Sequence, residues 1–208
     1  MTDRPHRPAL FAGHEFSAFQ GDVDPATVTQ MAHETARELL SRVRVAGEDA
    51  RDRAVHFTDD NGIEVLAELW SHASGHSLPG ALWRVYLLRD LIRQQAEHIA
   101  VAFDLGVSVS PTADVYVAGA AVPTNPHEVG EMADLILHGV FAGDMGDALD
   151  RAAAFCRLTS LGDMAIVRDI ETTRQRHAEQ LTAQAARLAL MAEELTRCAR
   201  LWRDGHLD

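Results

Sequence analysis

The chain of 208 residues contains no lysine, and all 19 of its basic residues are arginines. Lysine reaches the phosphates in a Walker A loop, forms the Schiff base of pyridoxal enzymes and contacts the nucleotide in kinase folds. None of these sites can be built here in its usual form. Codon bias toward arginine is the simpler origin of the absence, but the chemical consequence is the same under either explanation.

Cysteine and long apolar runs are scarce as well. Cys156 and Cys198 are isolated, so neither a CxxC redox motif nor a zinc knuckle is available, and we expect both side chains to be buried. No segment approaches the roughly 18 apolar residues of a membrane-spanning helix, and the N-terminus lacks the apolar segment of a secretory signal. We therefore expect a cytoplasmic protein that does not contact a membrane.

Positive charge is too sparse to balance the acidic residues, and the formal net charge is -12. Residues 54–150 contain 14 acidic residues and 3 arginines, whereas residues 151–208 contain 8 and 9. Such a surface repels a phosphate backbone, so we expect no nucleic-acid binding by the acidic face. An arginine patch near the C-terminus could still contact an anion, although a solvated acidic surface explains the composition by itself.

The composition otherwise fits a single all-helical domain over residues 1–208. Apolar residues make up 47% of the chain, which is enough to fill one core, and we expect a bundle of about six helices. Residues 1–21 combine prolines, glycines and charges with three phenylalanines. They predict an irregular arm that packs its aromatic rings onto the body or onto a second subunit.

Capping residues mark the ends of the first helices. Asp24 before Pro25 predicts a helix start, and Gly47 predicts the end of that helix. The charged stretch 48–61 is ambiguous, although RAVHF within it could be extended. Further helices are expected over residues 62–72 and 77–106, the second beginning at a serine cap and ending at a glycine.

The second half of the chain has more regular boundaries. Apolar and polar residues alternate in part of the stretch 107–125, which also contains prolines. This pattern is compatible with a strand pair, a helical turn or a packed loop. From the cap at Asn125 onward, glycine-aspartate junctions divide three expected helices, over residues 126–142, 145–160 and 164–204.

The last of these helices, of about 40 residues, would be about 60 Å long at 1.5 Å per residue. Its apolar side chains repeat every seven residues and form a leucine and alanine seam: Leu181, Leu188, Leu195 and Trp202, with Ala178, Ala185, Ala192 and Ala199. The seam could be buried in the core of its own chain or against a second copy. A helix this long favours the second arrangement, so we predict a homodimer through the C-terminal helix.

The stretch PHEVGEMADLILH, residues 126–138, supplies the main candidate site. His127, Glu131, Asp134 and His138 lie on one side of the expected helix, opposite its apolar residues. They could bind a divalent metal if a facing helix adds ligands, or they could be the solvated face of that helix. Because these positions span about 16 Å of helix axis, only Glu131 with Asp134 could share one ion.

The run EMADLILHGVF, residues 131–141, resembles the ExxD helix of the all-α nucleoside triphosphate pyrophosphatases of the MazG type. The resemblance implies that Glu131 and Asp134 help to hold magnesium at the triphosphate of a nucleotide. The family also has an earlier helix with an ExxE pair. Here the upstream helix offers only Asp90 and Glu97, seven residues apart, so the magnesium cage is incomplete.

No other motif is complete. His72 and His76 have the HxxxH spacing of a zinc site, but Gly75 and the restart at Ser77 predict a helix break between the two rings. There is no G-x-S-x-G nucleophile motif. We therefore expect a self-associating binding or regulatory protein without a resident cofactor, with a protein as a possible partner. The alternative is a divalent-metal-dependent nucleotide hydrolase, which requires Glu131 and Asp134 to face other carboxylates across a cleft.

Overall fold

The computed structural model describes residues 24–110, 114, 125–169 and 175–208, and within these ranges the chain forms helices and no strand. The all-α fold is therefore confirmed. In chain order, the helices are α2 (Pro25–Ala46), α3 (Glu48–Val55), α4 (Phe57–Asn61), α5 (Glu64–Trp70), α6 (Leu78–Gln94), α7 (Ala96–Val109), α9 (Pro126–Ala142), α10 (Met145–Asp169) and α11 (Gln175–Arg203).

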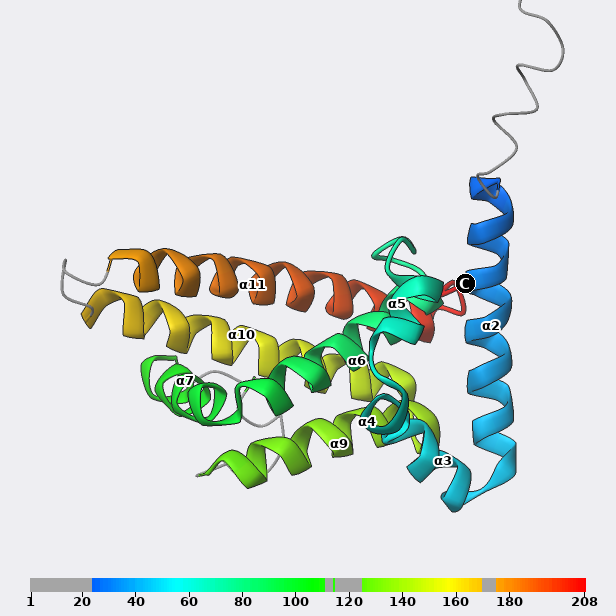
Figure 1. Ribbon diagram of the computed structural model, residues 1–208, viewed down its shortest axis with the longest axis horizontal. Coiled ribbons are helices and arrows are strands. Elements are labelled where there is room, and N and C mark those ends of the chain that lie inside the picture. Colours follow the sequence, from blue (N-terminus) through cyan, green and yellow to red (C-terminus); the bar gives the residue numbers. More distant parts are fainter. Residues whose placement is uncertain (1–23, 111–113, 115–124, 170–174) are drawn as a thin grey trace, which may run out of the picture.

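The two longest of the described helices, α10 and α11, organise the fold. Helices α10 and α11 run side by side, α7 packs across α10, and α9 lies below α10 in the view of Figure 1, with α6 packed against α9 and α11. Helix α2 runs across one end of this bundle, beside α5 and α6 (Figure 1). The rings of Phe103 and Phe155 stack between α7 and α10 with centroids 5.0 Å apart, in the middle of the apolar core.

The predicted caps form. Asp24, Ser77 and Asn125 each accept a hydrogen bond from a backbone N–H in the first turn of the helix that follows. Gly47 separates α2 from α3 with a φ of 91°, a conformation that residues with a Cβ rarely adopt. Residues 48–61, which were ambiguous from sequence, form the short helices α3 and α4, so the extended alternative for RAVHF is wrong.

The helix predicted over residues 77–106 is divided, and its predicted end is wrong. The chain breaks at Gln95 into α6 and α7, and α7 continues past Gly106 to Val109. A Cβ at Gly106 would overlap the carbonyl of Leu158 in α10. This glycine therefore permits a close helix crossing instead of ending its helix. The helix expected over residues 62–72 is also shorter, since α5 covers Glu64–Trp70.

The predicted boundary at residues 161–163 is wrong for the same physical reason. A Cβ at Gly162 would overlap the carbonyl of Ala102, so this glycine brings α10 close to α7. Asp163 does not cap a new helix but is fully buried and accepts a hydrogen bond from His98 Nε2 at 2.7 Å. Helix α10 consequently extends to Asp169, and the final helix begins at Gln175 and has 29 residues, instead of covering residues 164–204.

The leucine and alanine seam of α11 is packed within its own chain. Leu181, Leu188 and Leu195 are buried together with Ala185, Ala192 and Ala199. The main neighbour of α11 is α10, which runs beside it along most of its length (Figure 1). The intramolecular alternative therefore accounts for the burial of the heptad, and a second copy would have to use another face.

Several further expectations concern particular side chains and segments. Cys156 and Cys198 are buried, and burial raises the pKa of the thiols to about 12 and about 11. His72 and His76 lie between the end of α5 and the start of α6, so the predicted break between them is confirmed. The arm over residues 1–21 and most of residues 107–125 lie outside the described ranges.

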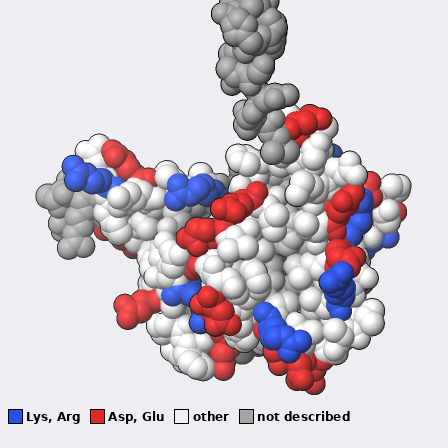
Figure 2. Space-filling view, turned by 45° about the vertical axis from the view of Figure 1, so that its right-hand side comes forward, with Lys and Arg blue, Asp and Glu red and all other residues white. Residues whose placement is uncertain are grey.

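The surface carries mixed charge. Figure 2 shows acidic side chains and arginines bordering a broad uncharged area on one face of the molecule. Among the described helices, none is both long enough and apolar enough to cross a membrane.

Candidate functional site

A buried arginine organises the candidate site. Arg89 lies on the inner face of α6 with 1% of its surface exposed. Its guanidinium donates to both carboxylate oxygens of Asp59, at 2.8 and 2.9 Å, and through Nε to Asp134 Oδ1 at 2.6 Å. A buried charge is tolerated only when it is paired and hydrogen-bonded in this way. Arg89 thus joins α4, α6 and α9.

The two carboxylates hold Arg89 in its charged form. Burial alone would lower the pKa of the guanidinium, but the hydrogen bonds with Asp59 and Asp134 outweigh burial and leave the pKa raised. In return, the hydrogen bond from Arg89 lowers the pKa of the Asp59 carboxyl to about 2. Arg89 and Asp59 are therefore both ionised throughout the physiological pH range.

His56 completes this cluster at the surface. Its Nδ1 lies 3.1 Å from Asp59 Oδ2 and 3.1 Å from a terminal nitrogen of Arg89. Only one of these contacts is a hydrogen bond at a time, because Nδ1 carries either a proton or a lone pair. With the proton on Nδ1, the ring donates to Asp59, and this bond contributes to the low pKa of that carboxyl. The second ring nitrogen is then left to a ligand or to solvent.

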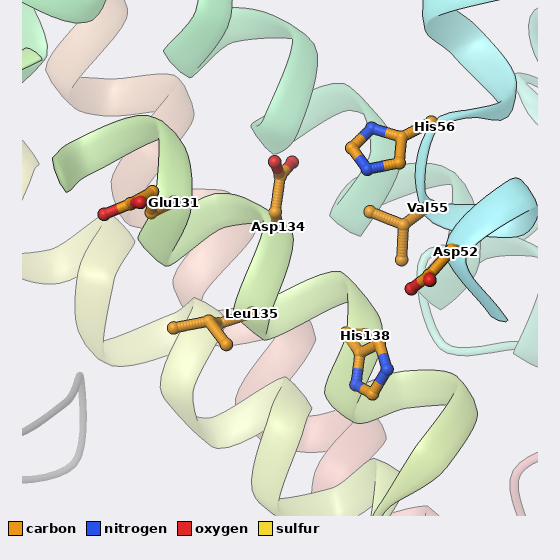
Figure 3. Close-up of a pocket in the computed structure, with 7 residues that line it drawn as sticks. All are labelled: Asp52, Val55, His56, Glu131, Asp134, Leu135 and His138. Carbon is orange, nitrogen blue, oxygen red and sulfur yellow. The ribbon is translucent and has the colours of Figure 1, made fainter. Parts of the chain in front are cut away.

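Next to this cluster, α3 and α9 enclose a cleft of about 410 Å³. Its lining residues combine acidic, imidazole and apolar side chains: Asp52, Val55, His56, Glu131, Asp134, Leu135 and His138. In Figure 3, Asp52 of α3 and His138 of α9 face each other across the cleft, and His56 and Asp134 lie at the other end. Glu131 extends away from the α3 side (Figure 3).

The structure brings some of the predicted metal-site residues to this cleft, but it does not direct them to one point. Asp134 is paired with Arg89, and Arg93 lies 3.9 Å from the same oxygen. The side chain of Glu131 is 62% exposed, and its Oε1 atom lies 3.6 Å from Nδ1 of the exposed His127. In the described part of the chain, no three histidine, cysteine, aspartate or glutamate side chains are grouped as a metal ion would require.

The proposed upstream neighbours lie elsewhere. Asp90 accepts a hydrogen bond at 2.7 Å from Gln94 on its own helix, and Glu97 is exposed near the start of α7. Neither is among the residues that line the cleft. A carboxylate does come across the cleft toward α9, but it is that of Asp52 on α3.

Sequence reasoning missed the residues that organise the site. The available signal for Arg89 was a charge within the apolar stripe of α6, between the buried Leu88 and Ile92. For Asp52, His56 and Asp59, the signal was a spacing of four and three residues, which is the repeat of one helical face. Each signal is also common on ordinary helices, and only the fold shows that they converge.

The arrangement combines a negative wall with an apolar surface. Val55 is buried behind the cleft, whereas Leu135 is 68% exposed at its edge. The guanidinium of Arg89 is already balanced by Asp59 and Asp134, so Asp52 and Glu131 leave the cleft with an excess of negative charge when the imidazoles are neutral. These features suit a cationic group on an apolar stem. No protein-family model, curated protein or solved structure matches this chain.

Proposed function

We propose that the protein is a cytoplasmic binding protein that captures a positively charged side chain of a partner protein in the cleft between α3 and α9. The observation that carries the proposal is the Asp52 carboxylate facing α9 across a cleft that also exposes Leu135. An arginine or lysine of the partner would lay its methylene groups on the exposed Leu135 and direct its charge toward the Asp52 carboxylate.

The size and charge of the site support this class of ligand. A volume of about 410 Å³ lies within the usual range of ligand-binding pockets, which is roughly 300–1,000 Å³. The formal net charge of -12 would also attract a basic partner over a distance and repel an acidic one. Binding should therefore weaken as the salt concentration rises.

The nucleotide hydrolase is the competing proposal, and the geometry favours it less. A magnesium site needs several carboxylate oxygens free to coordinate one ion. The Oδ1 atom of Asp134 is instead 2.6 Å from the Arg89 guanidinium, and Glu131 is turned to His127. A nucleoside triphosphate is negatively charged, so the negatively charged cleft would also repel it.

The test is calorimetric titration of the protein with a short peptide of alternating arginine and alanine. A peptide of the same length with glutamate in place of arginine serves as the probe of opposite charge. We expect saturable binding of the arginine peptide at low salt and none of the glutamate peptide. The double variant Asp52→Asn/Glu131→Gln should bind the arginine peptide about tenfold more weakly, which corresponds to about 1.4 kcal/mol.

The matched control is Asp49→Asn/Asp90→Asn. It also removes two negative charges, one from α3 and one from α6, but changes no residue that lines the cleft. It should retain the affinity of the unmodified protein within about twofold, because neither of the two carboxylates lines the cleft. Equal losses in the two double variants would mean that only net charge matters and would overturn the proposed site. Saturable binding of magnesium with nucleotide, abolished by Glu131→Gln, would favour the hydrolase.

Self-association as a homodimer through the C-terminal helix is a second part of the proposal. Since the heptad seam packs against α10, a second copy would contact the outward face of α11, where Leu190 is 57% exposed. Light scattering at micromolar concentration should give twice the 22.8 kDa mass of the chain, and Leu190→Arg should reduce it. A mass of one chain throughout the concentration range would contradict the dimer.

A further inference from the structure

A second, smaller cavity lies between α2, α5 and α6, and it is separate from the acidic cleft. It has a volume of about 180 Å³, and its lining includes Thr35, Leu39, Leu66, Leu69 and Trp70. We propose that this cavity is a binding site for a small, uncharged, apolar molecule. The inference goes beyond the proposed capture of a basic side chain and does not depend on it.

The polar groups in the wall are already paired with one another. Trp70 Nε1 donates to Thr35 Oγ1 at 3.1 Å, and that hydroxyl donates to the carbonyl of Met31 at 2.8 Å. Tyr86 donates its hydroxyl hydrogen to the carbonyl of Ala54 at 2.6 Å. A water molecule in a protein interior needs about two to four polar partners, so this cavity holds water poorly. The same pairing leaves the aromatic and aliphatic surfaces free to contact a ligand.

The shape distinguishes an inner end from an entrance. Leu66, Trp70 and Tyr86 are buried and form the inner end, whereas Leu39 and Leu69 are half-buried. Half-buried leucines can change rotamer more readily than side chains locked in the core. The entrance therefore lies on the side of the half-buried lining residues, which are Leu39, Leu69, Thr35 and Phe57.

The volume and the lining define the ligand class. An apolar protein cavity of about 150 Å³ is large enough to bind benzene or xenon. At about 180 Å³, the present cavity fits a single aromatic ring with a small substituent or a short branched hydrocarbon. None of its lining residues carries a charge, so an ionised ligand of the same size would lose its hydration without gaining a partner.

Its placement makes this site independent of the acidic cleft. Around the junction of α3 and α4, Ala54 and Phe57 line the cavity, whereas Val55 and His56 line the cleft. The two spaces therefore lie on opposite sides of one segment and share no lining residue. A failure of peptide binding at the cleft would leave the cavity proposal unaffected, and the reverse also holds.

The test uses two probes that share one ring, toluene and benzoate, titrated into the full-length protein and followed by NMR. Toluene should bind saturably and shift the indole N–H resonance of Trp70 more than those of Trp83 and Trp202, because only Trp70 lines the cavity. Benzoate should cause no saturable shift. Absence of saturable toluene binding to the unmodified protein, or equal binding of benzoate, would by itself overturn the proposal.

Variants then locate the bound probe. Leu39→Phe places a larger side chain at the entrance and should weaken toluene binding at least about tenfold by filling the space. Leu91→Phe is the matched control, since Leu91 is also a half-buried leucine packed against the core but does not line the cavity. If Leu39→Phe does not fold, Leu69→Phe takes its place. Unchanged affinity in a folded entrance variant would contradict the assigned site.

Discussion

At the scale of single residues, the site depends on one buried guanidinium. Replacement of Arg89 by methionine would keep much of its volume but leave Asp59 and Asp134 without their buried counter-charge. We expect the free energy of unfolding to fall by about 3–5 kcal/mol, the usual cost of removing one partner from a buried ion pair. Denaturant unfolding at neutral pH measures this change.

The neighbouring arginine supplies the control for that change. Arg93 lies 3.4 Å from Asp59, but its side chain is 44% exposed to solvent. Arg93→Met should therefore cost less than about 1 kcal/mol, as is usual for exposed ion pairs. Similar losses from the two replacements would contradict the role assigned to Arg89.

The carboxylate of Asp59 predicts how stability depends on pH. Its pKa is about 2 in the folded protein and 3.8 in its ordinary state, so the stability it contributes is present above about pH 4 and is lost as the pH falls toward 2. Asp59→Asn removes this contribution at every pH. The difference in unfolding free energy between the protein and this variant should be constant from pH 7 to pH 5 and should narrow below pH 4. A constant difference down to pH 3 would contradict the low pKa.

At the scale of the helices, features set by neighbouring residues can be predicted from sequence, whereas features set by contacts with a distant helix cannot. The starts of α2, α6 and α9 follow from their capping residues, because a cap acts within one turn of its own helix. Gly106 and Gly162 looked like helix ends, yet each lies inside a helix where the carbonyl of another helix approaches. Nothing within one turn of the sequence distinguishes these two uses of glycine.

The glycines also provide a paired test of that interpretation. Gly162→Ala would push a methyl group against the Ala102 carbonyl, and we expect a loss of about 1–3 kcal/mol or more in the free energy of unfolding. At Gly130 in α9, an added Cβ meets nothing within 4 Å. Gly130→Ala should therefore raise stability by up to about 1 kcal/mol through helix propensity alone.

Thermal or denaturant unfolding of the two variants compares these effects directly. Both changes add the same methyl group to a helical glycine, so a difference in sign isolates the helix crossing from propensity. If Gly162→Ala were as stable as Gly130→Ala, the close approach of α7 and α10 would be wrong.

At the scale of the whole molecule, the sequence predicted the fold class better than the site. Helical periodicity and capping recur along the chain, and together they predicted an all-α protein. The candidate stripe on α9 did lead to the cleft through Asp134 and His138. Arg89 remained hidden because its partners lie 30 and 45 residues away in the chain, and only the packing of α4, α6 and α9 brings them together.

One sequence pattern in this chain is compatible with two arrangements. A leucine heptad buries its seam equally well against a second copy or against another helix of the same chain. The continuation of α10 to Asp169 supplies that second helix within the chain. The predicted dimer therefore rests on the outer face of α11 and not on the heptad.

The central claim is that a positively charged group binds between α3 and α9, and an NMR titration tests it most directly. With the arginine peptide added at low salt, we predict that the backbone amide signals of Asp52, His56, Leu135 and His138 shift together along one saturable curve. Signals of Arg197 and Arg200 in α11, which line a different hollow, should stay unchanged. Shifts concentrated on α11, or no saturable shift on α3 and α9, would contradict the account.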